Sequence, residues 1–238
     1  MVEILIGLAL GLVLVSSVSG LIVGSRQTSR SERQLLEMQS SGRFVTEMLA
    51  REIRKAGYRS NRERSLLDNF PAVGSPFGAA GSVAVGGVAG NEITVRFQGL
   101  DNSTTGLVDC LGNGIDAGQD LWQTLSLVGG ELRCRARNLT TSTDQTAALV
   151  SQIEALLFTF GVDTDGDGFA DDYRAAAAVA DWARVASVNV QVRVLSSEDG
   201  VADAPQPYLD FNGNGVTPTD RRLRRTYGTV VALRNLLP

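Results

Sequence analysis

The chain has 238 residues, of which 43% are hydrophobic and 20% are charged, so it can bury a core and is not a disordered tail. Its formal net charge of -4 argues against a protein that holds nucleic acid mainly through phosphate contacts. Histidine is absent, which excludes the Ser-His-Asp and Cys-His catalytic arrangements, most zinc sites and the usual general base near neutral pH. The composition therefore favours a protein that is not an enzyme.

Residues 4–23 form one apolar run without a charged side chain, in which three serines are the polar interruptions. About 20 residues at a helical rise of about 1.5 Å each span roughly 30 Å, which is the hydrocarbon thickness of a bilayer. A buried core helix is the alternative, but a solitary run of this length with no polar face favours a membrane-inserted helix. We therefore predict that residues 1–24 are the membrane-inserted part of the chain.

Glu3 is the charged residue at the start of this apolar segment. A carboxylate in a bilayer costs several kcal/mol unless it reaches the interface or meets a cation. Either Glu3 lies at the end of the helix and reaches the head groups, or it pairs with the N-terminal amine of a neighbouring copy in an assembly. The residues themselves leave both interpretations open.

Residues 25–57 continue the helix with an amphipathic pattern. Apolar residues recur every three or four positions and define one stripe: Leu35, Met38, Gly42, Val45, Leu49, Ile53 and Ala56. The charged residues are predicted mostly on the other sides: Arg43, Glu47, Arg51, Glu52, Arg54 and Lys55. Gly57 is a plausible C-cap, so we expect one helix of about 55 residues. Its second half needs a globular partner to cover the apolar stripe.

Residues 58–238 are predicted to provide that partner as a β-sheet domain. Residues 58–90 are rich in Gly, Ser, Pro and Ala, and are expected to form an irregular connection. The segments with strand character are 92–98, 121–128, 131–137, 153–162, 185–195 and 225–233. Gly129-Gly130 between two of them is a hairpin signal. The prediction is an α+β protein, in which a twisted antiparallel sheet packs on the amphipathic half of the helix.

The two cysteines, Cys110 and Cys134, lack the spacing of a CxxC motif. If the domain lies outside the cytoplasm, they are best interpreted as one disulfide, which would stabilise the fold by about 3 kcal/mol. Two buried free thiols are the alternative. A metal or redox site is not favoured, because no further ligands accompany the cysteines.

An acidic stretch, Asp163-Thr-Asp-Gly-Asp-Gly-Phe-Ala-Asp171, carries the clearest chemical motif. Side-chain oxygens at positions one, three and five, with glycines that allow a tight turn, suit Ca²⁺, which prefers six or more oxygen ligands. Arg174 stands where an EF-hand has its bidentate Glu, so this is not a complete EF-hand. The predicted ligands are Asp163, Asp165, Asp167, Asp171 and the main-chain carbonyl of Phe169. A solvated acidic turn without a metal is the alternative.

A second stretch, residues 210–215 followed by Asp220, has the same ligand spacing with fewer charges. Asn-Gly turn chemistry explains it as well as calcium does. Four arginines follow closely, but neither aromatic platforms nor further basic residues accompany them. We therefore expect them at the start of a strand or in a protein contact, and we expect no nucleic-acid partner.

Four segments resemble known proteins. The N-terminal MVEILIGLALGLVLV is similar to the mature N-terminus of type IV pilin-like proteins, with Glu3 at the position of that family's glutamate. SSGRFVTEMLAREIRKAGY (40–58), FGVDTDGDGFADDY (160–173) and DRRLRRTYGTVVALRN (220–235) resemble the PilW family of minor pilins. The combination is more specific than the N-terminal pattern, because it includes both ends and the middle of the chain.

This resemblance implies a type IV pilin-like fold and a structural function. The first half of the helix would lie in the inner membrane before assembly and in the filament core afterwards, while the rest lies in the periplasm. A PilW-type minor pilin is implied to join other minor pilins in priming pilus assembly, and to be incorporated with the major pilin at or near the tip. Contact with a tip adhesin is left open. In this setting the pairing of Glu3 with a neighbour's amine is favoured, because an unpaired carboxylate in a filament core would be penalised.

The N-terminus departs from the family pattern. The family's precursor has a short basic leader that ends in glycine, and Met1 falls about two residues inside the expected mature start. Arg26, Arg30 and Arg33 follow the apolar run, and by themselves would place the C-terminal domain in the cytoplasm. The resemblance and the cysteine pair favour the periplasm instead. The alternative functions are a type II secretion pseudopilin and a membrane-anchored calcium-binding module.

Overall fold

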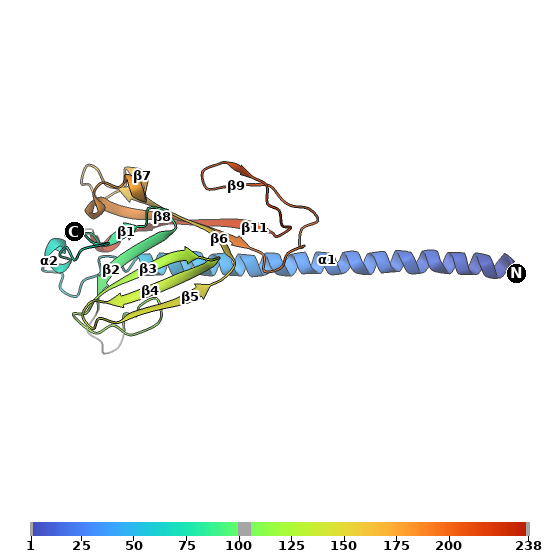
Figure 1. The fold of residues 1–238 in the computed structure, drawn as a ribbon, viewed down its shortest axis with the longest axis horizontal. Helices are drawn as coiled ribbons and strands as arrows, with labels where there is room; N and C mark the ends of the chain where they lie inside the picture. Colours follow the sequence, from blue (N-terminus) through green and yellow to red (C-terminus); the bar gives the residue numbers. More distant parts are fainter. Residues whose placement is uncertain (1, 100–105, 237–238) are drawn as a thin grey trace. The chain divides into compact units, whose positions relative to one another are not determined.

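The computed structural model describes residues 2–99 and 106–236, and it is an α+β structure with one long helix and antiparallel sheets (Figure 1). The chain divides into two compact units. The first comprises Met1–Ser40 and Ser196–Leu223, and the second comprises Ser41–Leu195 and Arg224–Pro238.

Helix α1 runs without interruption over Val2–Ile53, which confirms the predicted single helix. It ends four residues before Gly57, which has a φ of 73° and donates its N–H to the Arg96 carbonyl at 2.9 Å. A left-handed φ at this position is easily adopted only by glycine, so Gly57 stops the helix. Most of the predicted apolar stripe is buried, but Leu35 is 37% exposed, so the prediction was wrong at that position.

In the first unit, Ser196–Leu223 lies against the part of α1 that follows the apolar run. The Gln27 amide donates to the Val201 carbonyl at 3.1 Å, and Arg30 forms an ion pair with Glu198 at 2.6 Å. Gln34 accepts hydrogen bonds from the N–H and hydroxyl groups of Ser197. The same segment forms a small hairpin of strands β9 (Tyr208–Leu209) and β10 (Gly215–Val216).

The second unit contains two larger antiparallel sheets, whereas the sequence predicted one. The five-stranded sheet has the order β1 (Ala84–Gly86), β2 (Glu92–Gln98), β3 (Asp120–Val128), β4 (Glu131–Asn138) and β5 (Asp144–Val150). The four-stranded sheet has the order β11 (Arg224–Ala232), β8 (Val185–Leu195), β6 (Ile153–Val162) and β7 (Asp172–Ala175). All six predicted strands are present with ends within one residue of the prediction.

Several short elements were not predicted. The connection 58–90 is not wholly irregular: it contains β1 and helix α2 (Leu66–Asn69), whose first turn is capped by the Ser65 hydroxyl. Strands β5 and β7 were also missed. The 3₁₀ helices are η1 (Ala176–Ala178), η2 (Trp182–Arg184) and η3 (Arg234–Leu236).

The core of the second unit includes buried charged residues, among them Arg96 on β2, which is 1% exposed. Its guanidinium forms an ion pair with Asp120 and donates to the Pro71 carbonyl at 2.7 Å. It also lies over the rings of Phe70 and Phe77, at 5.3 and 5.9 Å from their centroids. These contacts replace the water that Arg96 loses on burial, and they attach the connection 58–90 to the sheet.

Gly42 of α1 lies against the ring of Tyr227 on β11. A Cβ atom at this position would lie 2.1 Å from the Tyr227 ring, which is shorter than any acceptable contact. Glycine is therefore required here by the packing of the ring on the helix, although it lowers the helix propensity.

We predict that Gly42→Ala destabilises the second unit, because the Tyr227 ring would have to move away from the helix. The expected loss is about 1–3 kcal/mol in the free energy of unfolding, typical of an overpacked core. Chemical unfolding of the full chain in detergent measures it. Gly24→Ala is the matched control, because its added Cβ meets nothing within 4 Å. Equal stability of Gly42→Ala and the wild type would contradict this packing argument.

Candidate functional site

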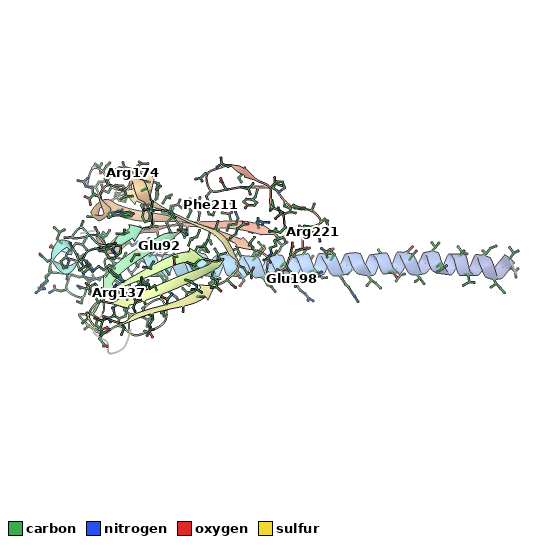
Figure 2. All side chains as sticks on the ribbon, in the orientation of Figure 1. Glu92, Arg137, Arg174, Glu198, Phe211 and Arg221 are labelled. Atoms are coloured by element: carbon green, nitrogen blue, oxygen red, sulfur yellow. A yellow bond between two sulfur atoms is a disulfide. The ribbon has the colours of Figure 1, made fainter. Side chains whose placement is uncertain are left out.

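The first candidate site is the apolar surface of the N-terminal part of α1. Its described large apolar side chains project from the helix and are exposed, from 49% at Ile22 to 75% at Leu21 (Figure 2). Within residues 2–99 and 106–236, α1 is the one helix long and apolar enough to cross a membrane, judged by length and composition. Exposure of this much contiguous apolar surface to water is unfavourable, so it requires a lipid or protein environment.

The serines of this segment are compatible with such an environment. The Ser16 and Ser17 hydroxyls donate to the Val13 carbonyl at 2.9 and 2.8 Å, and the Ser19 hydroxyl donates to the Val15 carbonyl at 2.8 Å. Because these donors are satisfied within the helix, their transfer into an apolar medium does not leave an unpaired hydroxyl proton. The serines therefore add little to the free-energy cost of placing this segment in an apolar environment.

Glu3 lies in the first turn of α1 and is exposed. The helix dipole favours a negative charge at this end. No ion pair between Glu3 and another residue is present in the part of the chain that the structure describes. The described residues of the chain therefore leave the Glu3 carboxylate without a cation.

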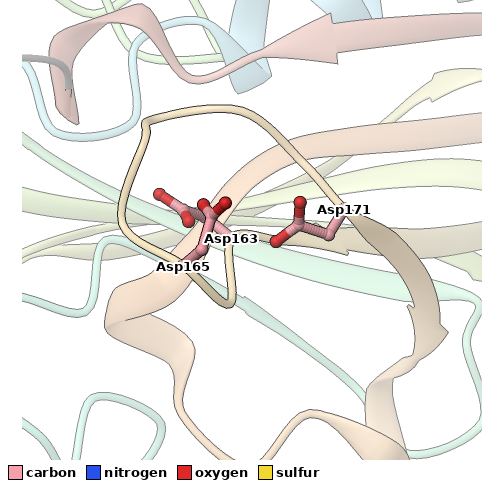
Figure 3. Close-up of side chains that lie close together, drawn as sticks. All are labelled: Asp163, Asp165 and Asp171. Atoms are coloured by element: carbon pink, nitrogen blue, oxygen red, sulfur yellow. The ribbon is translucent and has the colours of Figure 1, made fainter.

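The second candidate site is the acidic loop between β6 and β7. Carboxylate oxygens of Asp163, Asp165 and Asp171 all lie within 4.8 Å of one another (Figure 3). The loop is built on main-chain bonds: the Asp163 N–H donates to the Arg184 carbonyl, and the Asp171 N–H donates to the Val162 carbonyl. Its lining continues into a shallow pocket of about 230 Å³ that reaches Leu233 and Leu236.

Hydrogen bonds keep two of these aspartates ionised. The Gly166 and Gly168 N–H groups donate to the Asp163 carboxylate at 2.6 and 2.8 Å, which lowers the pKa of Asp163. The hydroxyl and N–H of Thr164 donate to Asp171 at 2.6 and 2.7 Å, which lowers the pKa of Asp171. The loop is therefore negatively charged at neutral pH, as a site for a hard cation requires.

The structure brings together three of the four predicted aspartate ligands. The Asp167 carboxylate accepts a hydrogen bond from the Phe169 N–H at 2.8 Å and is not part of the close group, while the Phe169 side chain is 72% exposed. In the second stretch, Asp210 accepts the N–H groups of Asn212 and Asn214, so this stretch forms a turn around one carboxylate. The described part of that stretch contains no comparable group of acidic residues.

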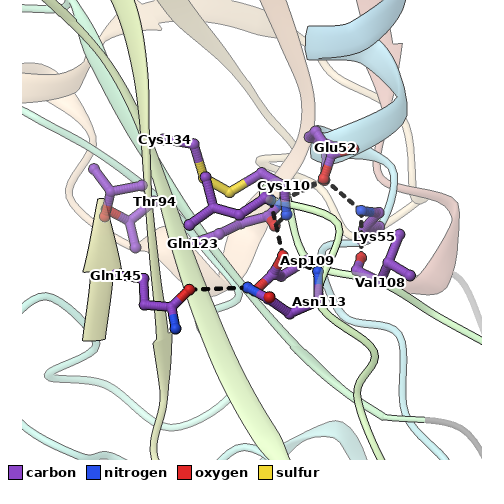
Figure 4. Close-up of a disulfide and its surroundings, with 12 residues drawn as sticks. Glu52, Lys55, Thr94, Val108, Asp109, Cys110, Asn113, Gln123, Cys134 and Gln145 are labelled. Atoms are coloured by element: carbon purple, nitrogen blue, oxygen red, sulfur yellow. Dashed lines mark hydrogen bonds and ion pairs between the residues drawn. A yellow bond between two sulfur atoms is a disulfide. The ribbon is translucent and has the colours of Figure 1, made fainter. Parts of the chain in front are cut away.

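The sequence analysis missed a buried polar cluster beside the disulfide (Figure 4). Cys110 and Cys134 form the predicted disulfide, with their Cα atoms 6.3 Å apart. The Gln123 side chain, which is fully buried, accepts the Cys110 N–H at 3.0 Å and donates to the Glu52 carboxylate at 2.9 Å. A single amide from β3 thus connects the end of α1 to the disulfide loop.

Glu52 was predicted on the solvent side of α1, but it is 1% exposed. Its carboxylate pairs with Lys55 and with Arg51, and Lys55 also donates to the Val108 carbonyl at 2.7 Å. Burial lowers the pKa of Lys55, and the Glu52 carboxylate opposes part of this effect. Spacing could have identified Glu52, because it lies three residues after Leu49, on the apolar stripe itself.

Comparisons with known proteins agree with this architecture. The family model for the type IV pilus-assembly protein W matches residues 123–235, nearly half of the chain. A type IV-like pilin from Thermus thermophilus superposes with a TM-score of 0.51 and 15% identity, over 85% of this chain and 96% of that one. At this identity the likeness concerns the fold alone. The search of curated proteins found no match.

The fold and the apolar helix therefore define a type IV pilin-like protein. The family match confirms the resemblance to PilW that the sequence motifs indicated, and it relates the chain to the type IV pilus system. A pilin-like structural family, and not an enzyme family, is what the chain matches. The apolar N-terminal helix fits a membrane-anchored pilin with a pilus-associated location.

We predict that Lys55→Met destabilises the chain, because it removes a cation from the buried Glu52 carboxylate. The expected loss in the free energy of unfolding at pH 7 is about 3 kcal/mol, as for other broken buried ion pairs. The double variant Glu52→Gln/Lys55→Met should recover most of this loss, since no buried charge then remains unpaired. Chemical unfolding of the full chain in detergent tests both. A double variant no more stable than Lys55→Met would contradict the electrostatic explanation.

Proposed function

We propose that the protein is a minor pilin that helps to prime type IV pilus assembly and is incorporated at or near the pilus tip. The observation that carries this proposal is the exposure of the described large apolar side chains of α1 between Val2 and Ile22. Both lipid tails and neighbouring apolar helices can cover such a surface, so the helix can pass from the membrane into a filament at low cost. Other minor pilins and the major pilin are the proposed partners.

The proposed topology places the globular part of the chain in the periplasm and the first half of the helix, residues 1–24, in the inner membrane before assembly. Support comes from the disulfide between Cys110 and Cys134, because disulfides persist in oxidising compartments such as the bacterial periplasm. After assembly, the same helix would lie in the filament core, and the globular part would face the exterior. In that core, the exposed Glu3 carboxylate pairs with the N-terminal amine of a neighbouring subunit.

The test is a comparison of Glu3→Ala with Glu32→Ala, which removes an exposed carboxylate from the same helix outside the apolar segment. Each variant is expressed in a host that lacks its own copy, and the amounts in the membrane and in sheared pili are measured by immunoblot. We expect Glu3→Ala to be inserted in the membrane but lost from pili, while Glu32→Ala is incorporated normally. Normal incorporation of Glu3→Ala would favour a membrane-anchored module without a filament role.

We further propose that the acidic loop binds calcium. Three carboxylates within 4.8 Å would repel one another when ionised, and a divalent cation relieves that repulsion. The lowered pKa values of Asp163 and Asp171 support this proposal, because the carboxylates need no deprotonation before they bind the metal. Bound calcium would stiffen the connection between β6 and β7.

The calcium proposal predicts that added Ca²⁺ raises the melting temperature of the full chain in detergent and that a chelator lowers it. At a calcium concentration one hundred times the Kd, the stabilisation would be about 2.7 kcal/mol. Asp165→Asn should reduce this response, and Asp210→Asn, in the second stretch, should keep it. A melting temperature that is the same in Ca²⁺ and in chelator would exclude the site.

A further inference from the structure

Strand β5 (Asp144–Val150) is the outermost strand of the five-stranded sheet and pairs on one side with β4. None of the described strands pairs with its other side. Seven residues at about 3.4 Å each give an open edge of about 24 Å. Every residue from Asp144 to Ala148 is exposed.

The register shows which main-chain groups of β5 face outward. The Asn138 N–H donates to the Thr143 carbonyl at 2.9 Å, which marks a hydrogen-bonded pair at the start of the ladder. Hydrogen-bonded and non-bonded pairs alternate along antiparallel strands. Gln145 and Ala147, opposite Ala136 and Cys134, therefore bond to β4. The N–H and C=O groups of Asp144, Thr146 and Ala148 point away from the sheet.

Over Asp144–Ala148 this edge has few of the features that normally prevent strand addition, and the pairing with β4 becomes irregular only after Ala148. Edge strands are usually protected by proline, by lysine, by bulges or by their shortness. β5 contains neither proline nor lysine, and its one charge, Asp144, is held by Arg135 at 2.8 Å. The outer strands at the other sheet edges differ: β1 has three residues, β7 has four, and β11 begins with two arginines.

The buried side chains on one face of the sheet also end at β4, and those of β5 on the same face are exposed. Cys134 and Ala136 on β4 are buried, whereas their β5 partners Ala147 and Gln145 are exposed. β5 therefore extends beyond the core with small, uncharged side chains on this face. A neighbouring chain that added a strand would cover these side chains as well as satisfy the outward main-chain groups.

We propose that the outer edge of β5 is a docking site for an extended strand of a neighbouring pilin-like subunit, bound by main-chain hydrogen bonds. An open row of alternating N–H and C=O groups selects an extended strand rather than a helix or a small ligand. On the face of Ala147 the β5 side chains are uncharged, which favours small or apolar residues in the added strand. On the face of Thr146, the exposed Arg135 of β4 lies opposite, which favours a polar or acidic residue there. This inference rests on the proposed function, because it names a contact that the assembling subunit makes.

The test uses proline to remove one outward N–H. Thr146→Pro leaves the β4–β5 hydrogen bonds intact, since proline is tolerated at an edge position whose N–H faces solvent. Thr146→Val changes the side chain but keeps the N–H, and is the matched control. Ala148→Lys is a second variant, in which a charged side chain at the edge hinders the addition of a strand. It tests the proposal if Thr146→Pro fails to fold. Ala147→Pro removes an inward N–H and should destabilise the sheet in a thermal melt.

The measurement is photocrosslinking in cells, from a photoreactive amino acid at Gln145 of the full chain. We expect a crosslink to a strand of another pilin-like subunit. Loss of a main-chain hydrogen bond of about 1.4 kcal/mol would lower its yield about tenfold in Thr146→Pro. Ala148→Lys should lower it similarly, and Thr146→Val should not. Undiminished yield in the folded Thr146→Pro and Ala148→Lys variants, or a crosslink that maps only to a helix, would overturn the proposal.

The Glu3→Ala variant separates this inference from the proposed function. If Glu3→Ala is lost from pili while the β5 variants crosslink and assemble as the wild type does, the docking site is wrong and the minor-pilin function stands. If both Glu3→Ala and the β5 variants assemble normally, the proposed function is wrong as well, and the docking site is overturned with it.

Discussion

The rest of the structure depends on one constraint. A continuous 52-residue helix carries, between Val2 and Ile22, described large apolar side chains that are exposed. Hydration of this apolar surface is unfavourable, so either lipid or other helices must cover it. The serine hydroxyls inside the segment are satisfied by the helix's own carbonyls, which makes either phase acceptable. A helix with such a surface is therefore compatible with both lipid and neighbouring apolar helices.

The C-terminal part of the helix is firmly attached to the sheets of the second unit. Two features provide the attachment in the second unit. Gly42 lets the Tyr227 ring of β11 lie directly on the helix, and Glu52 binds Gln123 of β3. Gln123 in turn holds the main chain at Cys110, so the disulfide loop and the helix end share one buried amide. The same residues therefore fix the helix to both sheets.

Most of the fold could be predicted because its elements carry strong periodicity. The apolar run and the amphipathic stripe together identify α1, and the segments with strand character identify six strands whose predicted ends agree with the structure within one residue. β5 could not be predicted because nearly all of its residues are exposed, so no alternation marks it. Glu52 was predicted away from the apolar stripe because it is charged, although its spacing from Leu49 places it on the stripe. For the acidic loop, spacing predicted the grouping of Asp163, Asp165 and Asp171, but it could not show that Asp167 lies apart, because that depends on the local turn.

Thiol accessibility tests the central claim most directly, because both native cysteines are held in a disulfide and do not react. Single cysteines in place of Leu12 and Arg43 would be treated with a membrane-impermeant thiol reagent, first in intact membranes and then in sheared pili. The account predicts that the cysteine at position 43 is labelled in membranes, whereas the cysteine at position 12 remains unlabelled in both membranes and pili. Labelling of position 12 as readily as position 43 would show that the apolar surface is not covered by lipid or by neighbouring helices, and would contradict the account.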